Sequence, residues 1–171
     1  MGAFIKIPFL IVPFTLQTFF VLLSGNLLGA RYGALSQALY IMIGLIGLPI
    51  FALGGGPGYI VQPTFGYLMA YPLGAFISGI LIQLIFQHKK DNLYSKRKFF
   101  LTIFAANMLS LLLIFLAGVS YLYINLNFII GKEIGFINAC WSGFIIFIPA
   151  AILKVLLASL MTIRIKKYIR I

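Results

Sequence analysis

Residues that could perform chemistry are scarce in this chain and stand apart from one another. The 171 residues include one histidine, one aspartate and one glutamate, which are His88, Asp91 and Glu133. Acid–base catalysis and metal binding need several titratable groups or ligands that converge on one point. The sequence therefore predicts no catalytic residue, no metal site and no cofactor.

One lysine stands where a charge is costly. Lys154 lies in the apolar run of residues 150–161, and a cation at the centre of a bilayer costs about 2.5–3.5 kcal/mol on insertion scales. It could snorkel to the interface, since it follows Pro149 by about one and a half helical turns. Because both carboxylates lie outside the apolar runs, we favour a lysine that faces a cavity and binds an anionic ligand.

Further residues could supply the directional hydrogen bonds that hold a ligand in an apolar pocket. All of them are expected near the same side of the protein as Lys154. They are Thr15, Gln17, Gln62, Thr64 and Tyr67.

The elements that must position these residues are membrane helices. Hydrophobic residues make up 63% of the chain and charged residues 9%, whereas soluble domains are about half apolar and about a quarter charged. Runs such as 99–123 exceed the roughly 20 helical residues that cross a bilayer. We predict an all-α membrane protein with one domain over residues 1–171. The expected transmembrane helices are 14–30, 33–53, 64–87, 99–124 and 149–167.

Two segments between the predicted helices, and a set of regularly spaced glycines, can each be interpreted in two ways. The glycine-rich residues 54–58 cannot stay helical, and form either a cavity wall or a plain turn. Residues 135–147 are either an interfacial segment over the outer mouth or the outer part of the last helix. Small residues at Gly25, Gly29 and Gly33 let another helix approach closely, and we favour packing within the protein over a partner interface.

The basic residues predict the orientation. The net charge is +11, and the excess lies in the connection before residue 99 and in the C-terminal tail, as in cytoplasmic segments of cell-membrane proteins. That placement argues against nucleic-acid binding. It puts the C-terminus in the cytoplasm and the glycine-rich loop outside. With five helices residue 1 would also lie outside, so either the N-terminus crosses unaided or a further helix precedes Met1.

Several motifs resemble the BioY family, the biotin-specific substrate-binding (S) components of energy-coupling-factor (ECF) transporters. The resemblance covers nearly the whole chain. The residues that carry it are Ile7-Pro8, Val12-Pro13-Phe14-Thr15-Leu16-Gln17, Leu28-Gly29-Ala30-Arg31-Tyr32-Gly33-Ala34, Tyr40, Gly44-Leu45-Ile46-Gly47-Leu48-Pro49-Ile50-Phe51 and Gln62-Pro63-Thr64-Phe65-Gly66-Tyr67-Leu68.

The resemblance implies a protein that binds biotin from the outer side and delivers it with a transmembrane coupling subunit and two ATPase subunits. It also implies six helices with both termini cytoplasmic, so this chain would begin where the family's first helix is ending. The missing helix is the one that docks on the coupling subunit in S components, and the chain as given is expected to couple poorly.

The family's last helix opens with Pro-Gly-Asp-x-x-Lys, and here Pro149 and Lys154 keep the pattern while Ala151 replaces the aspartate. The resemblance implies that Lys154 contacts biotin, and the change at Ala151 removes an acceptor for a ureido N–H. Gln62 or Gln17 could replace it. The alternatives are a carrier of lipoate or a related carboxylate, which has no ureido group, or a structural membrane subunit without a ligand.

Overall fold

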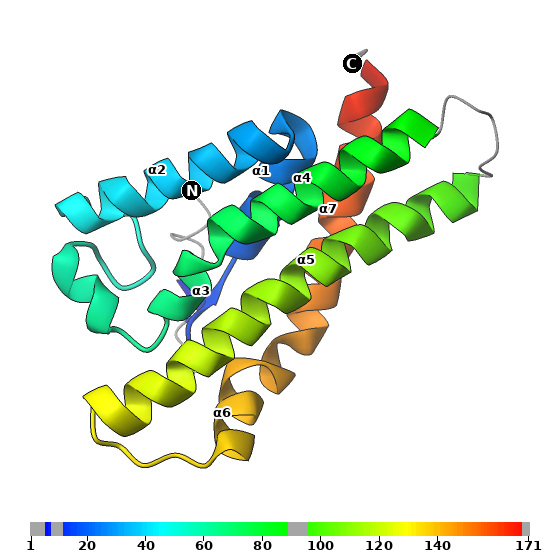
Figure 1. The fold of residues 1–171 in the computed structure, drawn as a ribbon. Helices are drawn as coiled ribbons and strands as arrows, with labels where there is room; N and C mark the ends of the chain where they lie inside the picture. The colour runs from blue at the N-terminus through cyan, green and yellow to red at the C-terminus, as the bar shows by residue number, and fades with distance from the viewer. Residues whose placement is uncertain (1–5, 8–11, 89–95, 169–171) are drawn as a thin grey trace.

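The computed structural model describes residues 6–7, 12–88 and 96–168, and these form a helical bundle (Figure 1). The main helices are α1 (Gln17–Leu28), α2 (Ala30–Ile46), α4 (Tyr71–His88), α5 (Lys96–Ile124) and α7 (Ile148–Tyr168). The shorter elements are β1 (Lys6–Ile7), β2 (Phe14–Thr15), η1 (Pro57–Val61), α3 (Phe65–Met69), the π-helical turn η3 (Asn125–Ile129), α6 (Phe136–Gly143) and η4 (Ile145–Phe147).

The predicted class, an all-α membrane protein, is confirmed. Three helical stretches within the described residues are long and apolar enough to cross a membrane: Phe65–Gln87, Arg97–Ile129 and Phe136–Lys167. Helices α1 and α2 have 12 and 17 residues and are shorter than the roughly 20 residues of a full span. The five predicted segments thus correspond to five main helices of unequal length.

The boundaries of the first two predicted helices were wrong. Phe14–Thr15 is not helical but pairs with Lys6–Ile7 in an antiparallel ribbon, and α1 begins at Gln17. The second helix ends at Ile46 and does not reach 53. Gly47 ends it with φ 125°, a conformation that glycine adopts without a steric penalty.

The later boundaries differ less. An irregular turn at Ala70 divides the predicted helix 64–87 into α3 and α4, while α5 and α7 begin slightly before the predicted residues 99 and 149. Residues 136–143 form a helix of their own. The chain turns at Phe144 with φ −134° and ψ −60°, so α6 is not a continuation of α7.

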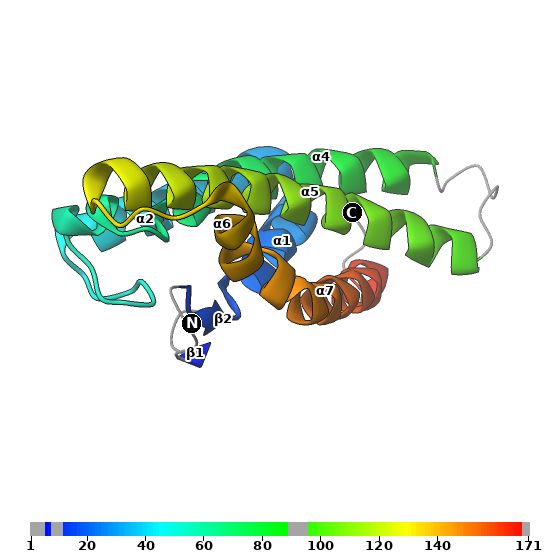
Figure 2. The same ribbon diagram turned by 90° about the horizontal axis from the view of Figure 1, so that it is seen from below.

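Glycines allow α1, α2 and α4 to pack in direct backbone contact. A Cβ atom on Gly33 would lie 2.7 Å from the Cα of Gly25, and one on Gly79 would lie 2.5 Å from the backbone nitrogen of Ala30. Figure 2 shows α2, α4 and α5 in one layer, with α1 and α7 on one side of it. The preference for internal packing of the glycine spacing is confirmed.

The two ends of the bundle differ in charge. The α1–α2 turn, the end of α4, the start of α5 and the C-terminal end of α7 lie together (Figure 1), and they carry Arg31, Arg97, Lys98, Arg164, Lys166 and Lys167. The opposite end holds residues 47–64 and α6, and the connection before α6 carries Lys132 beside Glu133, whose formal charges cancel. Lys89, Lys90, Asp91 and Arg170 lie outside the described residues.

Candidate functional site

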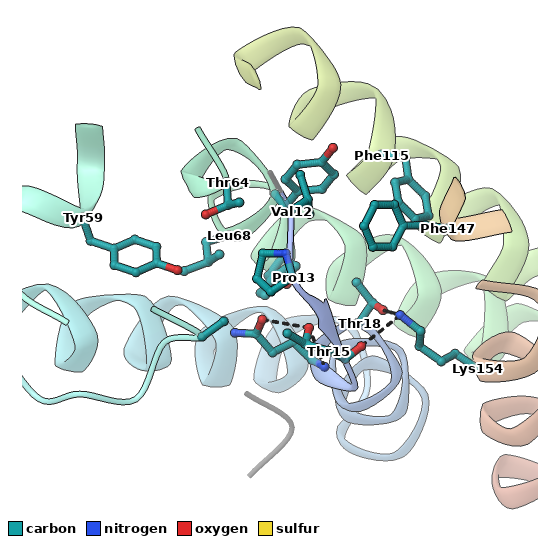
Figure 3. Close-up of a pocket in the computed structure, with 14 residues that line it drawn as sticks. Val12, Pro13, Thr15, Thr18, Tyr59, Thr64, Leu68, Phe115, Phe147 and Lys154 are labelled. Carbon is teal, nitrogen blue, oxygen red and sulfur yellow. Dashed lines mark hydrogen bonds between the residues drawn. The ribbon is translucent and has the colours of Figure 1, made fainter. Parts of the chain in front are cut away.

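A cavity lies between α1, α7 and the loop after α2 (Figure 3), toward the end of the bundle opposite the basic residues (Figure 1). Segments from both halves of the chain line it, because α1 and α7 pack together while the loop after α2 closes one side. The lining residues are Val12, Pro13, Thr15, Gln17, Thr18, Ala52, Tyr59, Thr64, Tyr67, Leu68, Tyr71, Phe115, Phe147 and Lys154.

Lys154 faces this cavity and does not snorkel. Its residue is only 7% exposed, and its Nζ donates to the carbonyl oxygen of Thr15 at 3.0 Å and to Oγ1 of Thr18 at 3.1 Å. Figure 3 shows the side chain directed from α7 toward these two residues. Both of these acceptors are neutral oxygens, and an ammonium group beside a cavity is suited to an anion or another electron-rich oxygen.

Gln17 connects the lysine side of the cavity to the loop after α2. Its Oε1 accepts a hydrogen bond from Thr15 Oγ1 at 3.0 Å, and its Nε2 donates to Tyr40 Oη at 2.7 Å. Tyr40 in turn donates to the carbonyl oxygen of Ile50 at 2.8 Å. Both the oxygen and the nitrogen of the Gln17 amide therefore already have hydrogen-bond partners within the protein. This side chain mainly holds the walls of the cavity in place.

Two hydroxyl groups beside the cavity are buried without a complete hydrogen bond. Tyr59 and Thr64 are each 5% exposed, and their hydroxyls lie near each other, with that of Tyr59 also near the backbone of Leu53, but neither completes a well-aligned hydrogen bond among the residues that the structure describes. Burial raises the pKa of Tyr59 above its usual value, so this hydroxyl keeps its proton and can donate at neutral pH. Buried polar groups are nearly always hydrogen-bonded, and two such groups beside a cavity indicate that a ligand or water completes them.

The predicted site residues fall into two groups. Thr15, Gln17, Thr64, Tyr67 and Lys154 are brought together around the cavity. The hydroxyl of Tyr67 is bonded to the carbonyl oxygen of Gly143 at 2.7 Å, so only its ring faces the ligand space.

The other two predicted residues do not line the cavity. Gln62 follows the short helix η1 and is exposed, so its proposed replacement of the lost acceptor is not supported by this position. Ala151 is 5% exposed and packs in the hydrophobic core. A methyl group there fills space between helices without reaching the ligand space.

Sequence reasoning missed three polar lining residues. Thr18 lies three residues after Thr15, and Tyr71 lies four residues after Tyr67, so the spacing within the helices expected from the sequence could have indicated both. Tyr59 directly follows the glycine-rich residues 54–58. An aromatic residue with a hydroxyl at the end of a possible cavity wall could have indicated the third lining residue. No sequence signal marked Phe115 and Phe147, whose rings form the apolar wall in Figure 3.

The arrangement fits a small molecule with an apolar body and polar ends. The ammonium group of Lys154 lies on one side of the cavity, and the hydroxyls of Tyr59 and Thr64 lie on the other (Figure 3). Apolar side chains lie between them, as in many ligand pockets. Within the described residues, no group of three or more His, Cys, Asp or Glu side chains could hold a metal ion.

The chain is similar to known proteins over nearly its whole length. A model of the BioY family matches residues 1–171. The chain is 41% identical to a probable biotin transporter BioY from Lysinibacillus sphaericus over 160 residues, which are 89% of this chain and 76% of that protein. It is 38% identical to the biotin transporter BioY of Thermotoga maritima over 167 residues, 97% of this chain and 88% of that protein.

A solved structure resembles the whole bundle. It is the crystal structure of the S component for biotin from an ECF-type ABC transporter, with a TM-score of 0.74 and 25% sequence identity. The match covers 94% of this chain and 79% of that one.

Proposed function

Because this chain belongs to the BioY family, we propose that it is the substrate-binding component of an ECF transporter and takes up biotin. It is a transport protein and not an enzyme. The observation that carries the assignment is the cavity in which Lys154 faces two buried hydroxyls, those of Tyr59 and Thr64, across apolar walls. Buried hydroxyls that lack a complete hydrogen bond are rare in folded proteins, and a bound ligand would supply that hydrogen bond.

Lys154 is the main polar contact of the ligand. Its Nζ is held by α1 through Thr18 and by the backbone of Thr15, so its position is set before the ligand arrives and less entropy is lost on binding. Tyr59 and Thr64 donate to or accept from the opposite polar end. Gln17 and Tyr67 shape the walls, and Ala151 has no direct role.

The delivery step needs proteins outside this chain. No Walker-type phosphate-binding motif occurs in the sequence, so nucleotide hydrolysis has to come from elsewhere. We assign that role to a transmembrane coupling subunit and two ATPase subunits of an ECF module. Co-purification of the chain with such a module in detergent tests the assignment, with only a minor fraction bound because poor coupling is expected, and complete absence of the module from the purified chain contradicts it.

The cavity faces outward and the C-terminus lies in the cytoplasm of the cell. The support is the concentration of Arg31, Arg97, Lys98, Arg164 and neighbouring lysines at the end opposite the cavity, since basic residues remain cytoplasmic. A fluorescent protein fused to the C-terminus is expected to be active, and an alkaline phosphatase fused there inactive. The reverse pattern would refute this orientation.

Equilibrium binding of labelled biotin to the purified chain tests the function directly. The wild type is expected to bind saturably, and Lys154→Ala to bind about 10- to 100-fold more weakly, because a hydrogen bond to a charged group contributes about 1.5–3 kcal/mol. Lys166→Ala is the matched control, since its Nζ lies over the ring of Phe86, 4.8 Å from its centre, between α7 and α4. Absence of saturable binding by the wild type would overturn the proposal.

A further inference from the structure

The segment 57–64 carries the hydroxyls of Tyr59 and Thr64 and consists of the short 3-10 helix η1 and the turn that follows it. Its backbone bonds to neighbouring residues are local, from Tyr59 N to the carbonyl oxygen of Gly56 and from Phe65 N to that of Gln62, each at 3.0 Å. On the α2 side, Gly56 N donates to the carbonyl oxygen of Gly44 at 2.7 Å. The rings of Phe51 and Tyr59 also pack there, with centroids 4.6 Å apart.

The outer part of α5 fixes the other side of this segment. Tyr121 Oη donates to the carbonyl oxygen of Ile60, and Asn125 Nδ2 donates to that of Val61 at 2.9 Å. Tyr121 and Asn125 are four residues apart and so lie on one face of the helix. Two adjacent carbonyl groups of the segment are therefore held by two successive turns of a long membrane helix.

Neither residue lines the cavity, and both are set firmly in place. Asn125 is completely buried and begins the π-helical turn, in which Ile130 N donates to the Asn125 carbonyl oxygen at 3.0 Å. Tyr121 packs beside Gly66, which has no side chain to hinder it, and its ring centroid is 6.2 Å from that of Phe65. A π-helical turn at this point fits the tendency of such turns to occur at functional sites.

We propose that Tyr121 and Asn125 are positioning residues that hold the segment 57–64 over the bound ligand and thereby set its dissociation rate. The inference rests on the proposed function, because it requires a ligand that contacts Tyr59 and Thr64. Under this proposal the ligand leaves as the segment moves away from it, and moving the segment breaks the hydrogen bonds from Tyr121 and Asn125. Losing either bond raises the population of the open state without removing any group that touches the ligand.

The test compares rates of biotin dissociation from the purified chain, measured by adding excess unlabelled biotin to the labelled complex. Tyr121→Phe and Asn125→Ala are each expected to raise the dissociation rate about two- to tenfold, the effect of one net hydrogen bond. The association rate is expected to stay the same or rise. A merely structural role would reduce the fraction of active protein and leave the dissociation rate of the remaining complex unchanged.

The same helix offers matched controls. Tyr123→Phe removes a hydroxyl two residues from Tyr121, and the ring of Tyr123 packs instead on Phe136. Asn127→Ala removes hydrogen bonds to the carbonyl oxygens of Tyr123 and Ile134 at 2.8 Å and 3.2 Å, away from the segment 57–64. Both controls are expected to keep the wild-type dissociation rate within about twofold, as for substitutions that leave the ligand-covering segment untouched.

Hydrogen exchange in the ligand-free protein gives a second measurement. The backbone amides of Tyr59 and Gln62 are expected to exchange faster in Tyr121→Phe and Asn125→Ala than in the wild type and the controls. Wild-type rates of dissociation and exchange in both variants, or equal increases in the controls, would overturn the inference while wild-type biotin binding leaves the proposed function intact. A wild type that does not bind biotin would overturn both.

Discussion

Gln17 Nε2 donates a hydrogen bond of 2.7 Å to Tyr40 Oη and so joins α1 to α2 beside the cavity. The bond belongs to a chain that begins at Lys154, passes through Thr15, and ends at the carbonyl oxygen of Ile50. Each link joins a different element. These contacts connect α7 to the loop after α2 by way of Thr15, whose carbonyl oxygen accepts from Lys154 and whose hydroxyl donates to Gln17, although Lys154 and Ile50 lie far apart in sequence.

The Gln17–Tyr40 bond can be measured by a double-mutant cycle. We expect Gln17→Ala and Tyr40→Phe to show a coupling free energy of about 0.6 kcal/mol, the average for hydrogen bonds between membrane helices. The measurement is the free energy of unfolding of the two single variants, the double variant and the wild type in detergent. Strictly additive effects would show that the bond contributes nothing to stability.

Thr18 is expected to orient Lys154. Thr18→Val keeps the side-chain shape but removes the oxygen that accepts from Nζ at 3.1 Å, so biotin should bind about two- to tenfold more weakly. Thr18→Ser retains the hydroxyl and should bind like the wild type. Equilibrium binding of labelled biotin to both variants checks this, and equal affinities for Val and Ser would contradict it.

Selectivity against lipoate is expected to depend on the hydroxyls of Tyr59 and Thr64. We expect the ureido group of biotin to form hydrogen bonds with Tyr59 Oη and Thr64 Oγ1, and lipoate has no such group. Sites built to hydrogen-bond a ligand reject analogues that lack the bonding group. Unlabelled biotin should displace labelled biotin at much lower concentration than lipoate does. Tyr59→Phe and Thr64→Val should each weaken biotin binding and leave that of lipoate nearly unchanged.

If Tyr59→Phe and Thr64→Val weaken the binding of biotin and of lipoate to the same extent, this explanation of selectivity is contradicted. Efficient competition by lipoate with the wild type would instead favour the carrier of related carboxylates, the alternative considered from the sequence.

Close packing of α1 on α4 makes Gly25 intolerant of a side chain. A Cβ atom there would overlap the backbone of Ala75 and Oγ of Ser78, so Gly25→Ala should destabilise the protein by about 1–3 kcal/mol, as overpacking does in cores. A Cβ atom on Gly58 would meet no atom of the described residues within 4 Å, and the φ of Gly58 is not positive. Thermal unfolding should show a lower Tm for Gly25→Ala and a nearly unchanged Tm for Gly58→Ala.

Composition and the length of apolar runs were sufficient to predict a helical membrane protein. They also marked Lys154, because a lysine in an apolar run without a nearby carboxylate is costly wherever it points. The motifs around Gln17 and Thr64 were sufficient to identify the family. All these properties depend on local sequence, which determines hydropathy, helix length and the residues of a motif.

Tertiary structure alone decided which side chains share the cavity. Gln62 and Thr64 are two residues apart, yet one is exposed and the other is buried beside the ligand space. Tyr59 and Phe115 come from segments distant in sequence. Both line the cavity only because α5 packs along α3 and α4. Spacing in the sequence predicts which side chains share one face of a helix. The direction of side chains in an irregular loop depends instead on hydrogen bonds from residues distant in sequence, here Tyr121 and Asn125.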